Sequence, residues 1–226
     1  MKLSIRLQTI ANFVKRGKIV ADIGTDHAYI PIYLVEHKII KKAFALDINK
    51  GPLEKANENI KLFGFEEIII TRLSNGLDKL KANEADTIII SGMGGELIID
   101  ILERKKEFFT SDKTFILSPH TKLELVRRYL IKNGFYISRE DMCIDEGKYY
   151  TVIEAGKTDN FINYRDTDLM FGKYLIDNKN PVLLQFLQRE KVKYESIVLN
   201  KGLGEGRREE IVNLLSMIKE TIDEMH

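Results

Sequence analysis

Short runs of β-branched and other apolar residues alternate with stretches of helical periodicity from about residue 18 to residue 157. The apolar runs predict seven strands, at residues 19–23, 42–47, 68–73, 85–91, 114–118, 135–142 and 149–155. Helical periodicity between them predicts helices at residues 29–37, 52–63, 95–106 and 122–133. Strands that alternate with helices form βαβ units, whose strands lie parallel and are buried on both faces. We therefore predict an α/β fold built on a largely parallel sheet.

The last two predicted strands are separated mainly by a short run of turn-forming residues, Asp145, Glu146 and Gly147. Such a connection favours a β-hairpin over a helical crossover. We therefore expect five parallel strands followed by an antiparallel edge.

Beyond residue 157 the β-branched runs end and helical patterns dominate. Leu183, Leu184 and Leu187 begin a helix that continues toward Leu199, and a second helix is expected at residues 207–225. Its apolar positions fall on one stripe, formed by Ile211, Leu214, Leu215, Ile218 and Ile222. Two antiparallel helices of this kind form a hairpin of coiled-coil type. We therefore divide the chain into residues 1–157, the sheet domain, and residues 158–226, a C-terminal helical hairpin.

The composition is that of a globular protein that folds without disulfides. The chain has 226 residues, 44% of them hydrophobic, and a single cysteine, Cys143, which has no partner within the chain. We see neither a secretory signal nor an apolar run of the length that a membrane span requires, so we expect a cytoplasmic protein. The formal net charge of +1 gives no argument for a nucleic-acid partner.

The N-terminal segment is basic and amphipathic. Lys2, Arg6, Lys15, Arg16 and Lys18 precede the first acidic residue, while apolar residues recur at helical spacing at Leu3, Leu7, Ile10 and Val14. This helix either presents a solvated face or contacts phosphate.

The first predicted strand ends in a glycine turn that opens a helix, over residues 20–29. Gly24 tolerates a positive φ and lets a ligand approach the backbone. Asp26 stands where a dinucleotide fingerprint has glycine, and its charge opposes a pyrophosphate at the helix N-terminus. A cationic ligand without phosphate, such as S-adenosylmethionine, fits better than NAD. The alternative is an ordinary turn in which Asp26 caps the helix.

The next two strand ends carry groups suited to a nucleoside. Asp47 closes the second strand, twenty-five residues after Asp22, where an acidic side chain binds ribose hydroxyls, and Ile48 follows it. After the third strand, Asn75 is placed to hydrogen-bond an adenine edge and Gly76 keeps the loop thin. A plain Asn-Gly turn is the alternative for this pair.

The fourth and fifth strands end in a glycine-rich segment and in a histidine. Glycines at 92, 94 and 95 allow a cofactor and a flat base to approach, and Met93 can pack on an aromatic ring. Ser118, Pro119 and His120 close the fifth strand, where His120 either orients a base or serves as a structural hydrogen-bonding group. The same two readings apply to His27. No spacing of His, Cys and acidic residues indicates a metal site.

Taken together, residues 22–31, 91–95 and 118–120 resemble the bacterial tRNA (adenine-N1)-methyltransferases that modify adenine 22. The resemblance covers nearly the whole chain and implies a Rossmann-like class I methyltransferase sheet with a C-terminal α-helical hairpin of coiled-coil type. It implies methyl transfer from S-adenosylmethionine to N1 of an adenine in tRNA, in a bacterial cytoplasm. Separately, we expect no metal, no membrane and no protein partner, and a monomeric protein.

We assign the predicted site residues on this basis. Residues expected at the reacting base are Asp26, His27, Tyr29, Met93 and His120. Residues expected to bind the cofactor are Asp22, Gly24, Thr25, Asp26, His27, Asp47, Ile48, Asn75, Gly76, Gly92, Met93 and Gly94. Because N1 of neutral adenine has a lone pair, the main task is positioning, and Asp26 would stabilise the cationic product. Tyr29 either stacks on the base or belongs to the core.

Other readings of the same residues stay open. The fold also serves methyltransferases that act on other RNAs, small molecules or proteins, and a non-catalytic RNA-binding relative would keep it too. Asp26 and the missing third glycine argue against an NAD oxidoreductase. In the hairpin, Arg189, Lys191 and Lys193 are either a tRNA contact or a solvated face.

Overall fold

The computed structural model describes residues 1–159, 162–200 and 204–226. The chain forms two compact units, Met1–Ile162 and Asn163–His226, which are described separately. The predicted domain boundary lay at residue 157. Among the described residues, no helix combines the length and the apolar character needed to cross a membrane.

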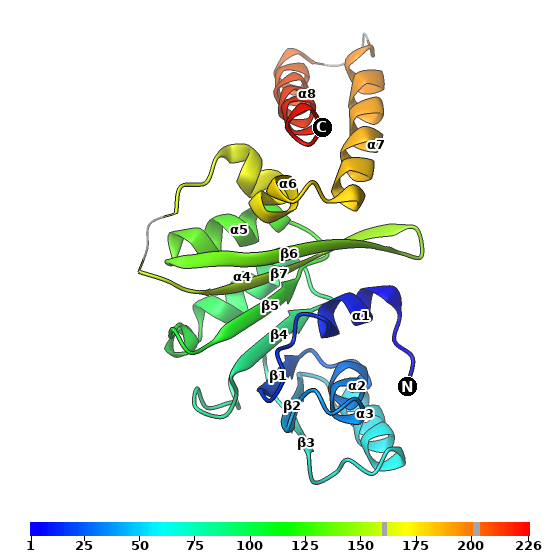
Figure 1. Cartoon of the computed structure of the whole chain (residues 1–226), viewed down its shortest axis with the longest axis vertical. Helices are drawn as coiled ribbons and strands as arrows, with labels where there is room; N and C mark the ends of the chain where they lie inside the picture. The colour runs from blue at the N-terminus through cyan, green and yellow to red at the C-terminus, as the bar shows by residue number, and fades with distance from the viewer. Residues whose placement is uncertain (160–161, 201–203) are drawn as a thin grey trace. The chain divides into compact units, whose positions relative to one another are not determined.

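The first unit contains a seven-stranded sheet in the order β3-β2-β1-β4-β5-β7-β6 (Figure 1). Neighbouring strands from β3 to β5 run parallel, β7 is antiparallel to β5, and β6 is antiparallel to β7. The strands are β1 (Ile19–Ile23), β2 (Lys42–Asp47), β3 (Ile69–Leu73), β4 (Thr87–Ser91), β5 (Thr114–Ser118), β6 (Phe135–Asp145) and β7 (Lys148–Lys157). The predicted α/β class and the antiparallel edge are confirmed.

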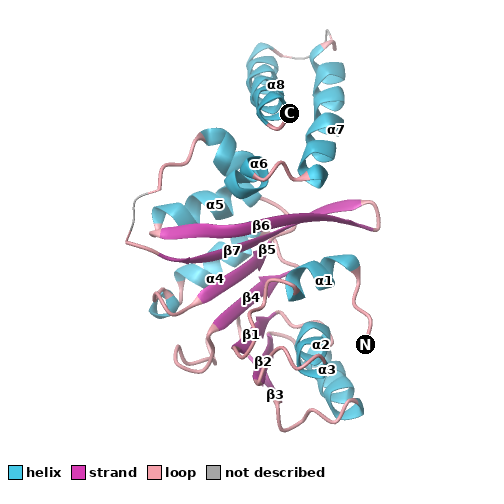
Figure 2. Ribbon diagram, in the orientation of Figure 1, coloured by secondary structure: helices cyan, strands magenta, loops and turns pink. Residues whose placement is uncertain are grey.

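Helices cover both faces of this sheet (Figure 2). The helices of the first unit are α1 (Ile5–Ala11), α2 (Tyr29–Glu36), α3 (Lys50–Leu62), α4 (Gly95–Glu103), the 3₁₀ turn η1 (Lys106–Phe108) and α5 (Leu123–Lys132). The alternation along β4 separates two buried clusters: Ile89 packs with α1, α2 and α3, whereas Ile88 and Ile90 pack with α4 and α5. A strand buried on both faces explains the uninterrupted apolar run at 88–90.

The second unit is helical. It comprises the π-helical turn η2 (Asp168–Gly172), α6 (Lys173–Asp177), α7 (Pro181–Val198) and α8 (Glu205–Glu224). Asn180 caps α7, since its side-chain oxygen accepts from the backbone N–H groups of Val182 and Leu183 at 3.0 Å each. The predicted helical hairpin is confirmed as α7 and α8, and its packing as a coiled coil stays a prediction. The short helices η2 and α6 were not predicted.

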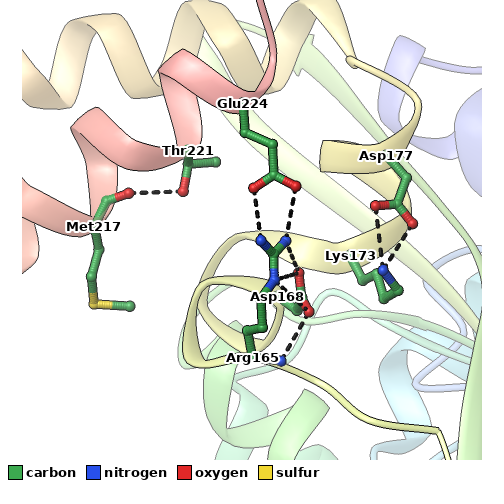
Figure 3. A network of polar contacts seen from close by, with 7 residues as sticks. All are labelled: Arg165, Asp168, Lys173, Asp177, Met217, Thr221 and Glu224. Carbon is green, nitrogen blue, oxygen red and sulfur yellow. Dashed lines mark hydrogen bonds and ion pairs between the residues drawn. The ribbon is translucent and has the colours of Figure 1, made fainter.

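Arg165 joins two parts of the helical unit (Figure 3). Its guanidinium donates to both carboxylate oxygens of Glu224, at 2.9 and 3.0 Å, and to Asp168 Oδ1 at 2.7 Å. Asp168 is buried, which by itself raises its pKa, but hydrogen bonds from the Arg165 side chain and backbone lower the pKa overall. The arginine therefore compensates a buried carboxylate and links the segment before η2 to the end of α8.

Candidate functional site

A cavity of about 500 Å³ opens at the carboxyl ends of the parallel strands. Open α/β sheets bind ligands at this edge, and the volume is in the range of small-molecule sites. Its lining includes residues from the ends of β1, β2, β4 and β5, from the loop after β3, and from α1. Eleven of the predicted site residues line it: Asp22, Gly24, Asp26, Tyr29, Asp47, Ile48, Asn75, Gly76, Gly92, Met93 and His120.

Three further predicted residues, Thr25, His27 and Gly94, lie outside that lining. Thr25 and His27 are in the β1–α2 turn and support residues that do line the cavity. Gly94 is the N-cap of α4 and lies next to Met93. A direct contact between these three residues and a ligand remains a prediction.

The turn after β1 buries a carboxylate at the floor of the cavity. Asp22 is 4% exposed, and the Thr25 hydroxyl donates to its Oδ2 at 2.7 Å. Burial raises the pKa of Asp22 to about 6; the Thr25 hydrogen bond opposes this shift, and the charges of Asp47 and Asp26 add to it. A bound cation would relieve both the desolvation and the repulsion, so the turn is suited to a positively charged ligand.

The same turn continues through two successive non-glycine residues in the left-handed region. His27 has φ 59° and Ala28 has φ 57°, a conformation that L-residues rarely adopt. The side-chain amide of Asn59, on α3, donates to the His27 carbonyl oxygen at 3.0 Å and helps to hold the turn. Backbone strain of this kind gathers at functional sites.

The strained turn exposes an acid and two rings. The Asp26 side chain is 80% exposed, and its Oδ1 lies 3.1 Å from Nε2 of His27. The rings of His27 and Tyr29 stack with centroids 5.1 Å apart and planes 8° from parallel. The N-cap of α2 is Ala28, without a side-chain hydrogen bond, so the alternative reading of Asp26 as a helix cap is wrong. Tyr29 is 37% exposed, so it is only partly buried.

The ends of β2 and β3 form the other side of the cavity. Asp47 accepts from the backbone N–H of Asn49 at 2.7 Å through Oδ1, and Ile48 is 59% exposed beside it. Asn75 Oδ1 accepts from the Arg104 guanidinium at 3.3 Å, which competes with the expected hydrogen bond to an adenine amino group. Gly76 keeps the loop close to α4, because a Cβ there would lie 2.9 Å from Ile101.

The end of β4 brings a side chain over the glycine turn. An added Cβ at Gly24 would lie 2.1 Å from the terminal methyl of Met93, so Met93 covers the turn after β1. Gly24 has φ 72° and Gly92 has φ 78°, so both positions need the freedom of glycine. The cavity therefore has a flexible apolar side chain above its glycine floor.

The end of β5 contributes His120, which meets Arg6 from α1. Arg6 Nη1 lies 3.1 Å from His120 Nε2, and both side chains approach the Tyr150 ring, at 5.4 Å for the guanidinium and 5.6 Å for the imidazole centroid. Burial, and then the charges of Arg6 and Lys148, lower the pKa of His120. A neutral imidazole is therefore favoured here.

Sequence reasoning did not assign Arg6 to the cavity. It identified the residue only as part of a basic helix face. No local motif marks it, because α1 reaches the strand ends through packing against a distant part of the chain. The other lining residues that were not predicted are Leu7, Ile23, Ile30, Asn49, Ser74, Ser91, Leu97 and Ile101.

Comparisons with known proteins agree with this geometry. The methyltransferase-domain family model matches residues 3–153. The tRNA (adenine(22)-N(1))-methyltransferase of Bacillus subtilis is 34% identical over 99% of this chain and 98% of its own length.

Solved structures of relatives match the fold of this chain over nearly its whole length. The crystal structure of the B. subtilis m1A22 tRNA methyltransferase TrmK is 33% identical and superposes with a TM-score of 0.87, covering 98% of this chain and 99% of that one. Mycoplasma capricolum TrmK, solved with S-adenosyl-homocysteine, is 31% identical with a TM-score of 0.89 over the whole of both chains. The chain therefore belongs to the tRNA (adenine(22)-N(1))-methyltransferase family.

Proposed function

We propose that this protein transfers a methyl group from S-adenosylmethionine to N1 of adenine 22 in tRNA. The observation that carries the proposal is the cavity at the strand ends, which gathers three carboxylates and three positive-φ glycines in a chain related over its full length to that family. No phosphate-binding glycine pattern accompanies them, so the site favours a cationic nucleoside over a dinucleotide.

The residues along the β1, β2 and β3 ends fit the cofactor. Asp47 would accept hydrogen bonds from the ribose hydroxyls, and the exposed side chain of Ile48 would pack on the adenine ring. Asp22 would face the positively charged end of the molecule, where its raised pKa would fall on binding. When bound, the cofactor supplies an electrophilic methyl group next to a sulfonium.

The residues along the β4 and β5 ends, with the turn after β1, would position the acceptor base. Adenine N1 already carries a lone pair, so no side chain has to remove a proton from it; the base must be unpaired and aligned. Tyr29, stacked on His27, offers a flat surface for the base, and Met93 and His120 would bound it on the other side. The exposed carboxylate of Asp26 would stabilise the positive charge that methylation leaves on adenine.

We also propose that the substrate is tRNA and that the protein is a cytoplasmic monomer. Part of the basic cluster on α7 serves the fold, because Arg189 and Lys193 both contact the buried carboxylate of Glu190, at 3.2 and 2.8 Å. Lys191 is therefore the member of that cluster that we favour for a phosphate contact.

The test is methyl transfer from labelled S-adenosylmethionine to an unmodified tRNA transcript, followed by digestion to nucleosides. We expect the label in N1-methyladenosine, and its loss when adenine 22 is replaced by guanine. Equal labelling of both transcripts would refute the assigned position. Absence of label in RNA, with S-adenosyl-homocysteine still binding, would refute tRNA as the substrate and leave the cofactor assignment in place.

A further inference from the structure

Arg6, a half-buried residue, places its guanidinium in the cavity without a carboxylate partner among the described residues. Its Nη1 donates to His120 Nε2 at 3.1 Å, and the group lies 5.4 Å from the centre of the Tyr150 ring. Asp145 is close, but its carboxylate accepts from the backbone N–H of Arg6 at 3.1 Å. The positive charge of the side chain is therefore met by a neutral ring nitrogen and an aromatic face.

Other arginines of the chain are held differently. Arg72 forms a bidentate ion pair with Glu84, with both hydrogen bonds at 2.7 Å. Arg127 pairs with the buried Glu140 at 2.8 Å, and Arg165 pairs with two carboxylates. The planar guanidinium fork matches an oxyanion, and these residues use it in that way. The guanidinium of Arg6 has the same shape and lies at the cavity wall, where a ligand instead of a carboxylate side chain can supply the oxyanion.

The charges that line the cavity are unevenly divided. Asp22, Asp26 and Asp47 supply negative charge, whereas Arg6 is the one arginine or lysine in the described lining. Lys148 adds positive charge near His120. Gly92 lies alongside, since a Cβ there would come within 3.6 Å of Arg6 Nη1. The cavity thus has one region suited to a cation and another, at the β4 and β5 ends, suited to an anion.

His120 is oriented by this contact. Arginine can only donate, so His120 Nε2 accepts and the neutral ring carries its proton on Nδ1. The imidazole thus holds Nη1 of the guanidinium, and the remaining guanidinium N–H groups are donors that a ligand can use. Donors on a charged guanidinium suit an oxyanion better than a neutral group.

We propose that Arg6, oriented by His120, forms an oxyanion-binding subsite that takes either a phosphate of the tRNA strand next to the target adenine or the carboxylate of the cofactor. Both ligands present paired oxygens of negative charge. The inference rests on the proposed function, because it takes these two oxyanions from the substrates of that reaction.

The experiment compares Arg6→Gln and Arg6→Lys with Arg16→Gln, a control at an exposed arginine of the same basic segment. Calorimetry gives the affinity for S-adenosyl-homocysteine and for methylthioadenosine, which lacks the amino-acid end. Binding of tRNA is measured over a series of salt concentrations. Circular dichroism confirms that each variant is folded.

The two sources give different results. If Arg6 binds phosphate, Arg6→Gln lowers the slope of log Kd against log salt by about 1 and leaves the affinity for both nucleosides unchanged. If it binds the carboxylate, the affinity for S-adenosyl-homocysteine falls on the order of tenfold or more, while methylthioadenosine binds as before. Arg6→Lys, which keeps the charge and loses the fork, falls between wild type and Arg6→Gln in either case.

The inference is overturned if Arg6→Gln matches Arg16→Gln in both measurements. This failure differs from failure of the proposed function, in which the wild-type protein itself transfers no methyl group to tRNA.

Discussion

Buried carboxylates are paired with basic side chains in the helices of the second unit, but not at the strand ends of the first unit. In the helical unit, Arg165 is bound by Asp168 and Glu224, and the buried Glu190 contacts two basic side chains. At the strand ends, the buried Asp22 has a hydroxyl as its hydrogen-bond donor and two other acids nearby. Charge that is paired within the chain supports the fold, whereas charge left without an opposite partner is available to a ligand and lowers stability.

The largest effect that this comparison predicts is a gain in stability from Asp22→Asn. The folded-state pKa of Asp22, about 6, is above the ordinary value of 3.8, so the ionised carboxylate destabilises the folded protein. The free energy of unfolding of the wild type falls as the pH rises from about 4 through about 6. Asparagine removes the ionisable group, and its side-chain oxygen can still accept from the Thr25 hydroxyl. Urea unfolding of the ligand-free protein should show the variant more stable by up to about 3 kcal/mol above pH 6.

The sign of this prediction depends on pH. Well below pH 4 the carboxyl is protonated in both folded and unfolded states, so the two proteins should then be equally stable. If wild type and Asp22→Asn differed in unfolding free energy by the same amount above pH 6 and well below pH 4, the destabilisation could not be assigned to ionisation of Asp22.

A loss of stability follows when the paired charge of the helical unit is broken. Arg165→Ala leaves the buried carboxylate of Asp168 without its guanidinium and should lower the free energy of unfolding by about 2 kcal/mol, less than for a fully buried pair because Arg165 is half exposed. The matched control is Lys219→Ala, which removes an exposed pair with Glu195 and should change stability by less than about 0.5 kcal/mol. Equal losses in chemical denaturation would show that Arg165 adds no more than a surface pair.

The smallest effect concerns the strained turn. Asn59→Ala removes the donor to the His27 carbonyl and should lower kcat for methyl transfer about fivefold, equivalent to ~1 kcal/mol, with cofactor affinity nearly unchanged. Asn57→Ala on the same helix is the control, since Asn57 accepts from the Thr71 hydroxyl on β3, away from the turn. A similar loss in both variants, or a loss confined to cofactor affinity, would exclude a positioning role for Asn59.

Local patterns predicted the parts of the molecule that depend on neighbours in sequence. The apolar runs located the strands, and Asp22, Gly24 and Asp47 marked the cavity because parallel strands end at one edge of the sheet. The short helices η2 and α6 escaped prediction, since each spans only five residues and a periodic signal needs a longer segment.

Contacts between distant segments could not be predicted in the same way. Arg6 meets His120 across 114 positions, and Asn59 supports His27 across 32. The position of Met93 over Gly24 depends on the pairing of β1 with β4. These contacts form only once the sheet and its covering helices are assembled. A single sequence therefore shows which residue types are present, but not which of them lie close together in space.

The most direct test of the account is the affinity for S-adenosyl-homocysteine, measured by calorimetry from about pH 5 to about pH 8, in wild type and in Asp22→Asn. The ligand carries a cationic amino group, so the wild-type affinity should rise as the pH passes through about 6 and then level off. Asp22→Asn should bind more weakly and without that step. Identical pH profiles in the two proteins would contradict the claim that unpaired charge at the strand ends binds the cofactor.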